Sequence, residues 1–441
     1  MSKVNLNRRT FLKKATFLSG AALSYSSFVV PFRVFGQNAP SEQIRLGCIG
    51  LGRMGSEDLK AFLEMDDVLV TALCDVDKKR AENARQIVQN KYTEKYGLNY
   101  KSDCRLYKNY QEVVWRDDID AVMVCTPDHW HAVPAIAAAK AGKDIFLQKP
   151  LTYTIGEGRN LANAVKNGRS VFQVGSQQRS DDKFRFACEL VQNRMIGDLK
   201  SIEVGFGIDP VAANFAPMSV PDHLDYQQWL GPAPQKPYTE KRVHPDDSYN
   251  RPGWMTIRDY SHGMITNWGA HHIDIAHWGM GLNNSGPEFI EAWADYPKDG
   301  LFDVHQRFYI TYTYPNGIKM IVTDNKTVKQ GVLFKGTSGW VYVKRGYIDA
   351  YPKSLLNYRL KPDEIHLYKS TDHKRNFVNC IKNRSETVAP VENAHRSNTA
   401  CVLGSIAMKL KQPLQWDYSQ EKFTNNEQAN RLLARPVREY A

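Results

Sequence analysis

The chain has 441 residues, of which 42% are hydrophobic and 24% charged, so it is neither disordered nor fibrous and has room for two or three domains. Its seven cysteines are an odd number spread along the chain, which argues against a disulfide-stapled scaffold, and no run of 18 apolar residues predicts a membrane span. The formal net charge of +11 raises the question of a nucleic-acid partner.

More than half of that charge lies in residues 1–36, which contain no acidic side chain and leave a net charge of only +5 for the rest. The segment has a basic head, a modestly apolar stretch rich in Ala, Ser and Gly, and small or turn-forming residues near Gly36–Gln37. This order is typical of a cleaved signal peptide, and Arg8-Arg9-Thr10-Phe11-Leu12-Lys13 resembles a twin-arginine (Tat) signal. A basic amphipathic helix of the mature fold is the alternative. The sequence therefore predicts a Tat-exported, periplasmic protein, and its mildly basic remainder gives no reason to expect nucleic acid.

A predicted strand at 44–49 runs directly into the glycines Gly50, Gly52 and Gly55, and a helical pattern follows them. In such a turn the glycines permit a tight bend, let the backbone approach a pyrophosphate and pack helix against strand. The next predicted strand, 68–73, leads to Asp75, where a carboxylate would bind ribose hydroxyls and repel a 2′-phosphate. We therefore predict an NAD-binding α/β Rossmann domain over 44–170, although NADP stays open because Lys78, Lys79 and Arg80 follow. A glycine-rich turn beside a surface carboxylate is the alternative.

Two later motifs each follow a predicted strand: Thr126-Pro127-Asp128-His129-Trp130-His131 and Gln148-Lys149-Pro150. With the glycine loop, they resemble the Gfo/Idh/MocA family of oxidoreductases, which act mostly on sugars and cyclitols. The resemblance implies that Lys149 helps to activate a substrate hydroxyl. Gln148 replaces the Glu of the family's Glu-Lys-Pro motif, and an exposed loop lysine is the alternative for Lys149. The resemblance also implies further cofactor contacts from Arg53, Met54, Thr126, Pro127, His131 and Gln148.

The second half shows strand-like runs at 201–206, 289–295, 304–314, 318–324, 332–337 and 339–344. The resemblance implies an α+β domain over 171–410 with an open, mostly antiparallel sheet that packs in dimers or tetramers, and a last helix that returns to the first domain. Residues 411–441 are expected to form a tail. The long irregular segment 207–258 is either an ordered sugar-lining loop or a structural wrap, with equal support for both.

The segment 261–274 matches the family's Asp-x-Gly-x-His-x-x-Asp pattern as Asn267, Gly269, His271 and Asp274. On a helix, the spacing of four and then three residues places Asn267, His271 and Asp274 on one face. Asn267 replaces an Asp and cannot accept a proton, which leaves Lys149 and His271 as the expected acid/base pair, with Asn267 orienting them. Expected substrate contacts are Arg179, Tyr260, His272 and Asp274. A metal site built from the histidines lacks any known zinc spacing, so none is predicted.

The leading hypothesis is an NAD(H)-dependent oxidoreductase that moves hydride between a ring carbon of a sugar or glycoside and a tightly bound nicotinamide cofactor. Because the Tat route carries folded proteins, the cofactor would stay bound and be reset by a second substrate or by the product. The main alternative is an NAD-dependent glycosidase or lyase that oxidises C3 transiently with no net redox change. A non-catalytic sugar-binding protein is the third possibility.

Overall fold

The first sheet of the computed structural model, which describes residues 43–282, 285–436 and 438, is built from six parallel strands in the order β3-β2-β1-β4-β5-β6. The expected signal segment lies outside the described residues. Parallel strands covered on both faces read as continuous apolar runs, as in the fully buried β4. The strands are β1 (Ile44–Ile49), β2 (Val68–Cys74), β3 (Arg105–Tyr107), β4 (Ala121–Val124), β5 (Asp144–Leu147) and β6 (Phe172–Val174).

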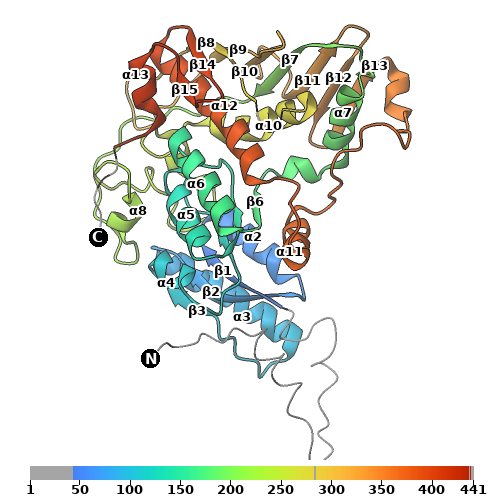
Figure 1. Cartoon of the computed structure of the whole chain (residues 1–441). Helices are drawn as coiled ribbons and strands as arrows, with labels where there is room; N and C mark the ends of the chain where they lie inside the picture. The colour runs from blue at the N-terminus through green and yellow to red at the C-terminus, as the bar shows by residue number, and fades with distance from the viewer. Residues whose placement is uncertain (1–42, 283–284, 437, 439–441) are drawn as a thin grey trace, which may run out of the picture. The chain divides into compact units, whose positions relative to one another are not determined.

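Helices cover both faces of this sheet, so alternate strand residues enter two separate apolar clusters. One layer is formed by α2 (Arg53–Leu63), α3 (Lys78–Tyr96) and, from far along the chain, α11 (His373–Asn383). The opposite layer is formed by α4 (Tyr110–Val114), α5 (Ala132–Lys140) and α6 (Ile155–Gly168), as Figure 1 shows. The result is a doubly wound Rossmann domain.

The second sheet has nine strands in the order β13-β12-β11-β7-β10-β9-β8-β14-β15, in which only β7 and β10 pair in parallel. It is therefore mixed and mostly antiparallel, as expected. The strands are β7 (Leu199–Phe206), β8 (Phe289–Ala294), β9 (Phe308–Thr313), β10 (Lys319–Asp324), β11 (Gly331–Gly336), β12 (Trp340–Lys344), β13 (Tyr347–Tyr351), β14 (Leu414–Asp417) and β15 (Lys422–Phe423).

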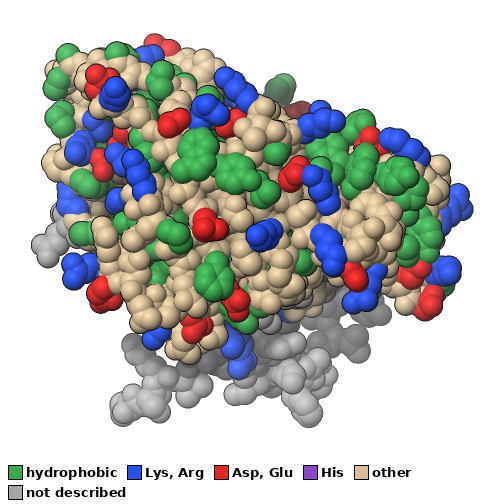
Figure 2. All heavy atoms as spheres, turned by 90° about the horizontal axis from the view of Figure 1, so that it is seen from above, with side chains coloured by type: hydrophobic (Ala, Val, Ile, Leu, Met, Phe, Trp, Pro, Cys, Tyr) green, Lys and Arg blue, Asp and Glu red, His purple; other side chains and the backbone are tan. Residues whose placement is uncertain are grey.

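One face of the second sheet is covered by α7 (Asp182–Gln192), α9 (Met264–Asn267), α10 (Gly269–Met280) and α12 (Val391–Leu410), which share its core. The other face is open: along β8 every second side chain is exposed, including Phe289 and Trp293 at 46% each. Figure 2, which looks onto the side that lies at the top of Figure 1, shows hydrophobic side chains gathered among charged ones.

Two expected boundaries differ from the structure. The first domain was expected to end at residue 170, but β6 pairs with β5 and completes the first sheet, because its buried residues need a partner on that edge. Residues 411–441 were expected to be a tail, yet β14 pairs with β8 and β15 pairs with β14, so the first part of this segment, as far as Phe423, extends the second sheet. As expected, α12 also reaches the first domain, where Arg159 of α6 binds Glu392 through two hydrogen bonds of 2.8 and 2.9 Å.

The residues from Ile44 onward form one compact unit, so contacts between its two sheets can be described directly. Within the described part of the chain, we find no helix with the length and apolarity needed to cross a membrane. The remaining short elements are α8 (Tyr226–Leu230), α13 (Glu427–Asn430), and the 3-10 turns η2 (Asp128–Trp130), η3 (Gln177–Ser180), η4 (Gly253–Thr256), η5 (Lys353–Asn357) and η6 (Arg431–Leu433).

Candidate active site

A cavity of about 660 Å³ lies at the carboxyl ends of β1, β4 and β5, where it meets α9, α10 and the segment around residues 244–255. This is the edge at which doubly wound sheets bind ligands, and the volume is in the range of small-molecule sites, roughly 300–1,000 Å³. Most of the predicted residues line it together: Gly50, Gly52, Arg53, Met54, Asp75, Thr126, Pro127, His131, Gln148, Lys149, Asn267 and His271.

The three glycines differ in geometry in the way that their motif predicts. Gly50 has φ +83°, and a Cβ there would lie 2.7 Å from the backbone of Cys125. At Gly55 a Cβ would lie 2.0 Å from the carbonyl oxygen of Gly50, so this glycine packs α2 against the turn and does not line the cavity. At Gly52, which precedes α2, a Cβ would meet nothing within 4 Å. The open space in front of this helix N-terminus fits a pyrophosphate.

Asp75 stands at the end of β2 with its carboxylate fixed by two backbone donors. Leu51 N donates to Oδ2 at 2.7 Å and Asp77 N donates to Oδ1 at 2.9 Å. Burial raises the pKa of Asp75, and these two hydrogen bonds oppose that rise. Of the nearby cations that left NADP open, Lys79 is paired with Asp246 and Asp247, and the Arg80 Nη2 is bonded to backbone carbonyls. The residues present fit a dinucleotide whose ribose hydroxyls face Asp75.

Lys149 follows β5 and precedes a cis peptide bond to Pro150. Its Nζ donates a hydrogen bond of 2.8 Å to Oδ1 of Asn267, 118 residues later in the chain. Removal from water lowers the pKa of Lys149, Asp128 opposes this shift, and the charges of nearby arginines reinforce it. An amine with a lowered pKa can take up and release a proton closer to neutrality.

Gln148 is hydrogen-bonded to Asp58, which forms an ion pair with Lys374. Its Nε2 donates to Oδ2 of Asp58 at 2.7 Å, and Oδ1 of the same carboxylate is 2.9 Å from Nζ of Lys374 on α11. Asp58 is 1% exposed, so a glutamate at position 148 would place a second carboxylate against a buried one. The amide of Gln148 instead supplies a donor, which accounts for Gln at this position.

His131 connects two strand ends. Its Nε2 lies 2.8 Å from the carbonyl oxygen of Thr126, and its Nδ1 contacts the carbonyl oxygen of Pro150. Burial lowers the pKa of His131 to about 4, so the ring is neutral at pH 7. It holds the cavity wall beside Lys149 in place.

His271 and Asn267 reach the cavity from neighbouring turns of α10 and α9. His271 is 6% exposed, and its Nδ1 has no hydrogen-bond partner among the described residues. Burial, followed by the charge of Lys149, lowers the pKa of His271 well below its usual range. His271 lines the cavity, and a neutral imidazole there can donate to or accept from a ligand hydroxyl.

The four expected substrate residues do not line the cavity. Asp274, expected on the same face as His271, lies about one turn further along α10 and is not part of the cavity lining. There it accepts from Nε and Nη2 of Arg179 at 2.7 and 2.9 Å. Tyr260 belongs to the apolar cluster of segment 207–258, and His272 Nδ1 faces Oε1 of Gln178 at 3.3 Å. Each side chain is buried and makes its contacts within the protein interior instead.

Several cavity residues were missed by the sequence analysis. Asp128 is 6% exposed and its Oδ2 accepts from Oγ of Ser261 at 2.7 Å. Burial raises its pKa to about 7, which the charge of Lys149 opposes. Arg345, in the turn after β12, lies over the Trp268 ring at 4.8 Å from its centroid. The position of Asp128 directly after Pro127 at a strand end is the sequence signal that could have found it.

The irregular segment 207–258 packs as a structural unit and also lines part of the cavity. Its residues Leu224, Tyr226, Trp229 and Tyr238 form an apolar cluster, so it packs as a structural unit. It also contributes Trp229 and Trp254 to the cavity, which Trp130 and Trp268 line from other parts of the chain. Among the residues that the structure describes, no group of three or more His, Cys, Asp or Glu is arranged to hold a metal ion.

Comparisons with known proteins agree with this geometry. Residues 44–176 match a family model described as "Oxidoreductase family, NAD-binding Rossmann fold", and residues 208–441 match one described as "Oxidoreductase family, C-terminal alpha/beta domain". A glycosyl hydrolase family 109 protein of Shewanella pealeana is 33% identical over 166 residues, which are 35% of this chain and 36% of that relative. A myo-inositol 2-dehydrogenase of Thermotoga maritima is 30% identical over 154 residues, 35% of this chain and 42% of that relative. The chain thus spans about two fifths or less of these curated relatives.

Solved structures resemble nearly the whole described chain. A levoglucosan dehydrogenase in complex with NADH and L-sorbose has a TM-score of 0.62 at 17% identity, covering 85% of this chain and 99% of that one. An aldose-aldose oxidoreductase from Caulobacter crescentus has a TM-score of 0.59 at 15% identity, covering 85% and 99%. At these identities the likeness establishes the fold.

Proposed function

Because the chain belongs to the Gfo/Idh/MocA oxidoreductase family and its first domain is an NAD-binding Rossmann domain, we propose that it oxidises a ring hydroxyl of a sugar or glycoside. The observation that carries the proposal is the hydrogen bond between Lys149 and Asn267. It lies at the same cavity as His271, Asp75 and the open space before α2. NAD, when bound, supplies the hydride acceptor. Asp75 would hold its ribose, and the turn at Gly52 its pyrophosphate.

Lys149 is the proposed general base. Its lowered pKa gives a neutral fraction that can take the proton of a hydroxyl as the carbon beneath is oxidised, and the ammonium returns the proton in the reverse direction. Asn267 accepts from Nζ and so fixes the direction of the amine without competing for the proton. The step balances as one hydride leaving the ring carbon and one proton leaving its hydroxyl.

His271 and Asp128 have complementary proposed roles. With its pKa lowered well below its usual range, His271 stays neutral and positions a sugar hydroxyl at the cavity wall. Asp128 supplies the negative charge that opposes the desolvation of Lys149, and so takes over part of the task of the carboxylate that Asn267 replaces.

A sugar is the proposed substrate class because the cavity wall combines aromatic rings with fixed polar groups. The tryptophans give the cavity wall aromatic surface of the kind that packs against a pyranose, and Arg251 and Arg345 add donors for its hydroxyls. The names of similar proteins, levoglucosan dehydrogenase and myo-inositol 2-dehydrogenase, support a polyhydroxylated ring.

A second candidate is a glycosidase or lyase that oxidises its substrate transiently and restores the cofactor. The relatives named glycosyl hydrolase family 109 proteins favour it. Oxidation at C3 acidifies the neighbouring C–H, and loss of that proton expels the glycosidic group and leaves a double bond between C1 and C2. In a glycosidase, water then adds to this double bond, and return of the hydride to C3 makes the cycle redox-neutral; a lyase omits the addition of water.

One experiment separates these functions. The protein is purified without added cofactor, the nicotinamide absorbance band is recorded, and glycosides are then added. A lasting rise in the reduced band supports net oxidation, whereas cleaved product without a lasting change supports the redox-neutral cycle. A protein that holds or binds no nucleotide and turns over no glycoside would contradict both and leave the non-catalytic binding protein.

We also propose that the chain is exported by the Tat route and assembles as a dimer or tetramer. The twin arginines and the acid-free first 36 residues support export. Replacing both Arg8 and Arg9 with lysine should retain the protein in the cytoplasm, and continued export of that variant would contradict the proposal. The open sheet face with exposed Phe289 and Trp293 supports assembly.

A further inference from the structure

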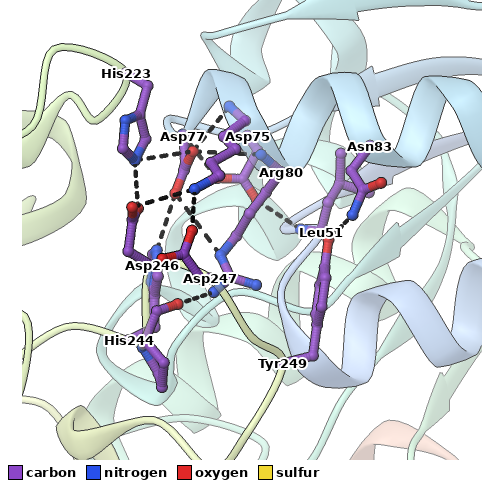
Figure 3. Close-up of polar contacts among 12 residues, drawn as sticks. Leu51, Asp75, Asp77, Arg80, Asn83, His223, His244, Asp246, Asp247 and Tyr249 are labelled. Carbon is purple, nitrogen blue, oxygen red and sulfur yellow. Dashed lines mark hydrogen bonds and ion pairs between the residues drawn. The ribbon is translucent and has the colours of Figure 1, made fainter.

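Residues 244–250, which we call the clasp, lie across the turn that joins β2 to α3 (Figure 3). The chain is brought there by backbone contacts upstream, where Lys78 N donates to the carbonyl oxygen of His223 at 2.9 Å and Asp225 N donates to that of Val76 at 3.0 Å. The irregular segment 207–258 is therefore anchored to the part of the Rossmann domain that follows Asp75.

The inner half of the clasp is held by buried polar contacts. Asp77 is 2% exposed; its Oδ1 accepts from Lys79 N at the start of α3, and its Oδ2 lies 2.9 Å from Nε2 of His244. Burial alone would raise the pKa of Asp77, but the hydrogen bond and charge of His244 outweigh it and hold that pKa below its usual range. The Arg80 guanidinium donates to the carbonyl oxygens of Pro245 and Ser248 at 2.8 and 3.1 Å.

The outer half is held by exposed contacts. Lys79 Nζ lies 3.1 Å from Asp246 and 2.6 Å from Asp247, and the Asn83 amide donates to the Tyr249 hydroxyl at 3.1 Å. Figure 3 shows these side chains converging from α3 and from the clasp. Neither Lys79 nor Asn83 lines the cavity, so each holds the clasp without facing its contents.

The cavity itself continues beneath the clasp. His244, Tyr249 and Asn250 line it together with Asp75 and Arg80. The Arg80 guanidinium lies 4.6 Å from the centroid of the Tyr249 ring, and its buried Nε has no hydrogen-bond partner among the described residues. A planar cation, an aromatic ring and a ribose-binding carboxylate around one space match the adenosine half of a dinucleotide.

We propose that the clasp closes over the adenosine half of NAD and slows its release, so that NAD stays with the protein as a resident group. The proposal rests on the NAD-binding domain and is independent of which sugar is oxidised. For the adenosine to leave, the clasp must lift, which separates Asp77 from His244 and Lys79 from two carboxylates at once. Retention of this kind is what a cofactor-dependent protein needs where no free NAD is supplied.

The test measures release of NADH from the whole protein, with nicotinamide fluorescence followed after an excess of unlabelled NAD is added. The variant Lys79→Ala with Asn83→Ala loosens the clasp without altering the cavity wall, and should release NADH about three- to tenfold faster than the wild type. Tyr249→Ala, which also removes a wall, should release it faster still. The matched control is Lys236→Ala, because the Lys236 side chain is 45% exposed against 48% for Lys79, lies in the same irregular segment as the clasp and has a weak partner in Asp259 at 3.9 Å.

An unchanged rate of NADH release from the double variant, or an equal acceleration by Lys236→Ala, would overturn the proposal that the clasp retains the cofactor. If the wild type holds no NADH, that result would overturn both the proposal for the clasp and the proposed function. A wild type that binds NADH but turns over no glycoside would overturn only the proposed function, since the release assay needs no sugar.

Discussion

Arg179 and Asp274 were both expected to contact substrate, but the structure pairs them with each other. The stability that this ion pair provides can be measured directly. Replacing Asp274 with Ala leaves the Arg179 guanidinium buried without its counter-charge, since the two side chains are only 5% and 2% exposed. Loss of one partner of a buried pair costs about 3–5 kcal/mol, whereas loss of an exposed pair costs about 0–1 kcal/mol. Asp303→Ala is the matched control, because Asp303 pairs with Arg258 at 38% and 50% exposure.

The free energy of unfolding is followed by urea denaturation, with Arg179→Met combined with Asp274→Leu as a third variant. If the pair is structural, this double variant loses less stability than Asp274→Ala alone, because no charge remains buried. NADH binding should persist in the folded fraction. A cost below about 1 kcal/mol for Asp274→Ala, similar to that of Asp303→Ala, would refute the buried-pair reasoning and return Asp274 to the substrate candidates.

Three further predictions follow from the cavity and the open sheet. Lys149→Ala should lower the rate of glycoside oxidation by about 10²–10⁴-fold while NADH binding is kept, and an unaltered rate would contradict its role as base. Asp128→Asn removes a charge that raises the pKa of Lys149, so the rising limb of the pH–rate profile should move to lower pH by about one unit; a shift to higher pH would contradict this sign. Trp293→Glu on the open sheet should reduce the oligomer to a smaller species in light scattering, and an unchanged mass would remove that face from the assembly.

Local patterns were sufficient for the first domain. The strand before Gly50, the spacing to Asp75 and the apolar runs of β4 and β5 reflect backbone requirements that act over a few residues, and these elements were found within a residue or two. The meeting of Lys149 with Asn267 across 118 residues has no local signal, and family resemblance supplied it. The missed strand β14 gains its place from pairing with β8, a contact that sequence periodicity does not encode.

Long-range burial decided the remaining differences. The helical spacing correctly placed Asn267 and His271 on one face, but it cannot tell where a cavity ends, so Asp274 was assigned to a ligand although Arg179 holds it. Asp128 reads as one of many surface carboxylates until the fold buries it beside Ser261. The clasp has no repeating pattern at all, and only the contacts of Asp77, Arg80 and Lys79 reveal its position.

The central claim is that hydride leaves a ring carbon of a sugar or glycoside for the bound nicotinamide. It is tested most directly with a glycoside carrying deuterium on all ring carbons, mixed with the purified protein and its bound NAD, followed by mass spectrometry of the released nucleotide. The account predicts that one deuterium appears in the nicotinamide with the wild type, and that it appears about 10²–10⁴-fold more slowly with Lys149→Ala. Consumption of the glycoside by the wild type with no deuterium in the nucleotide at any time would contradict it.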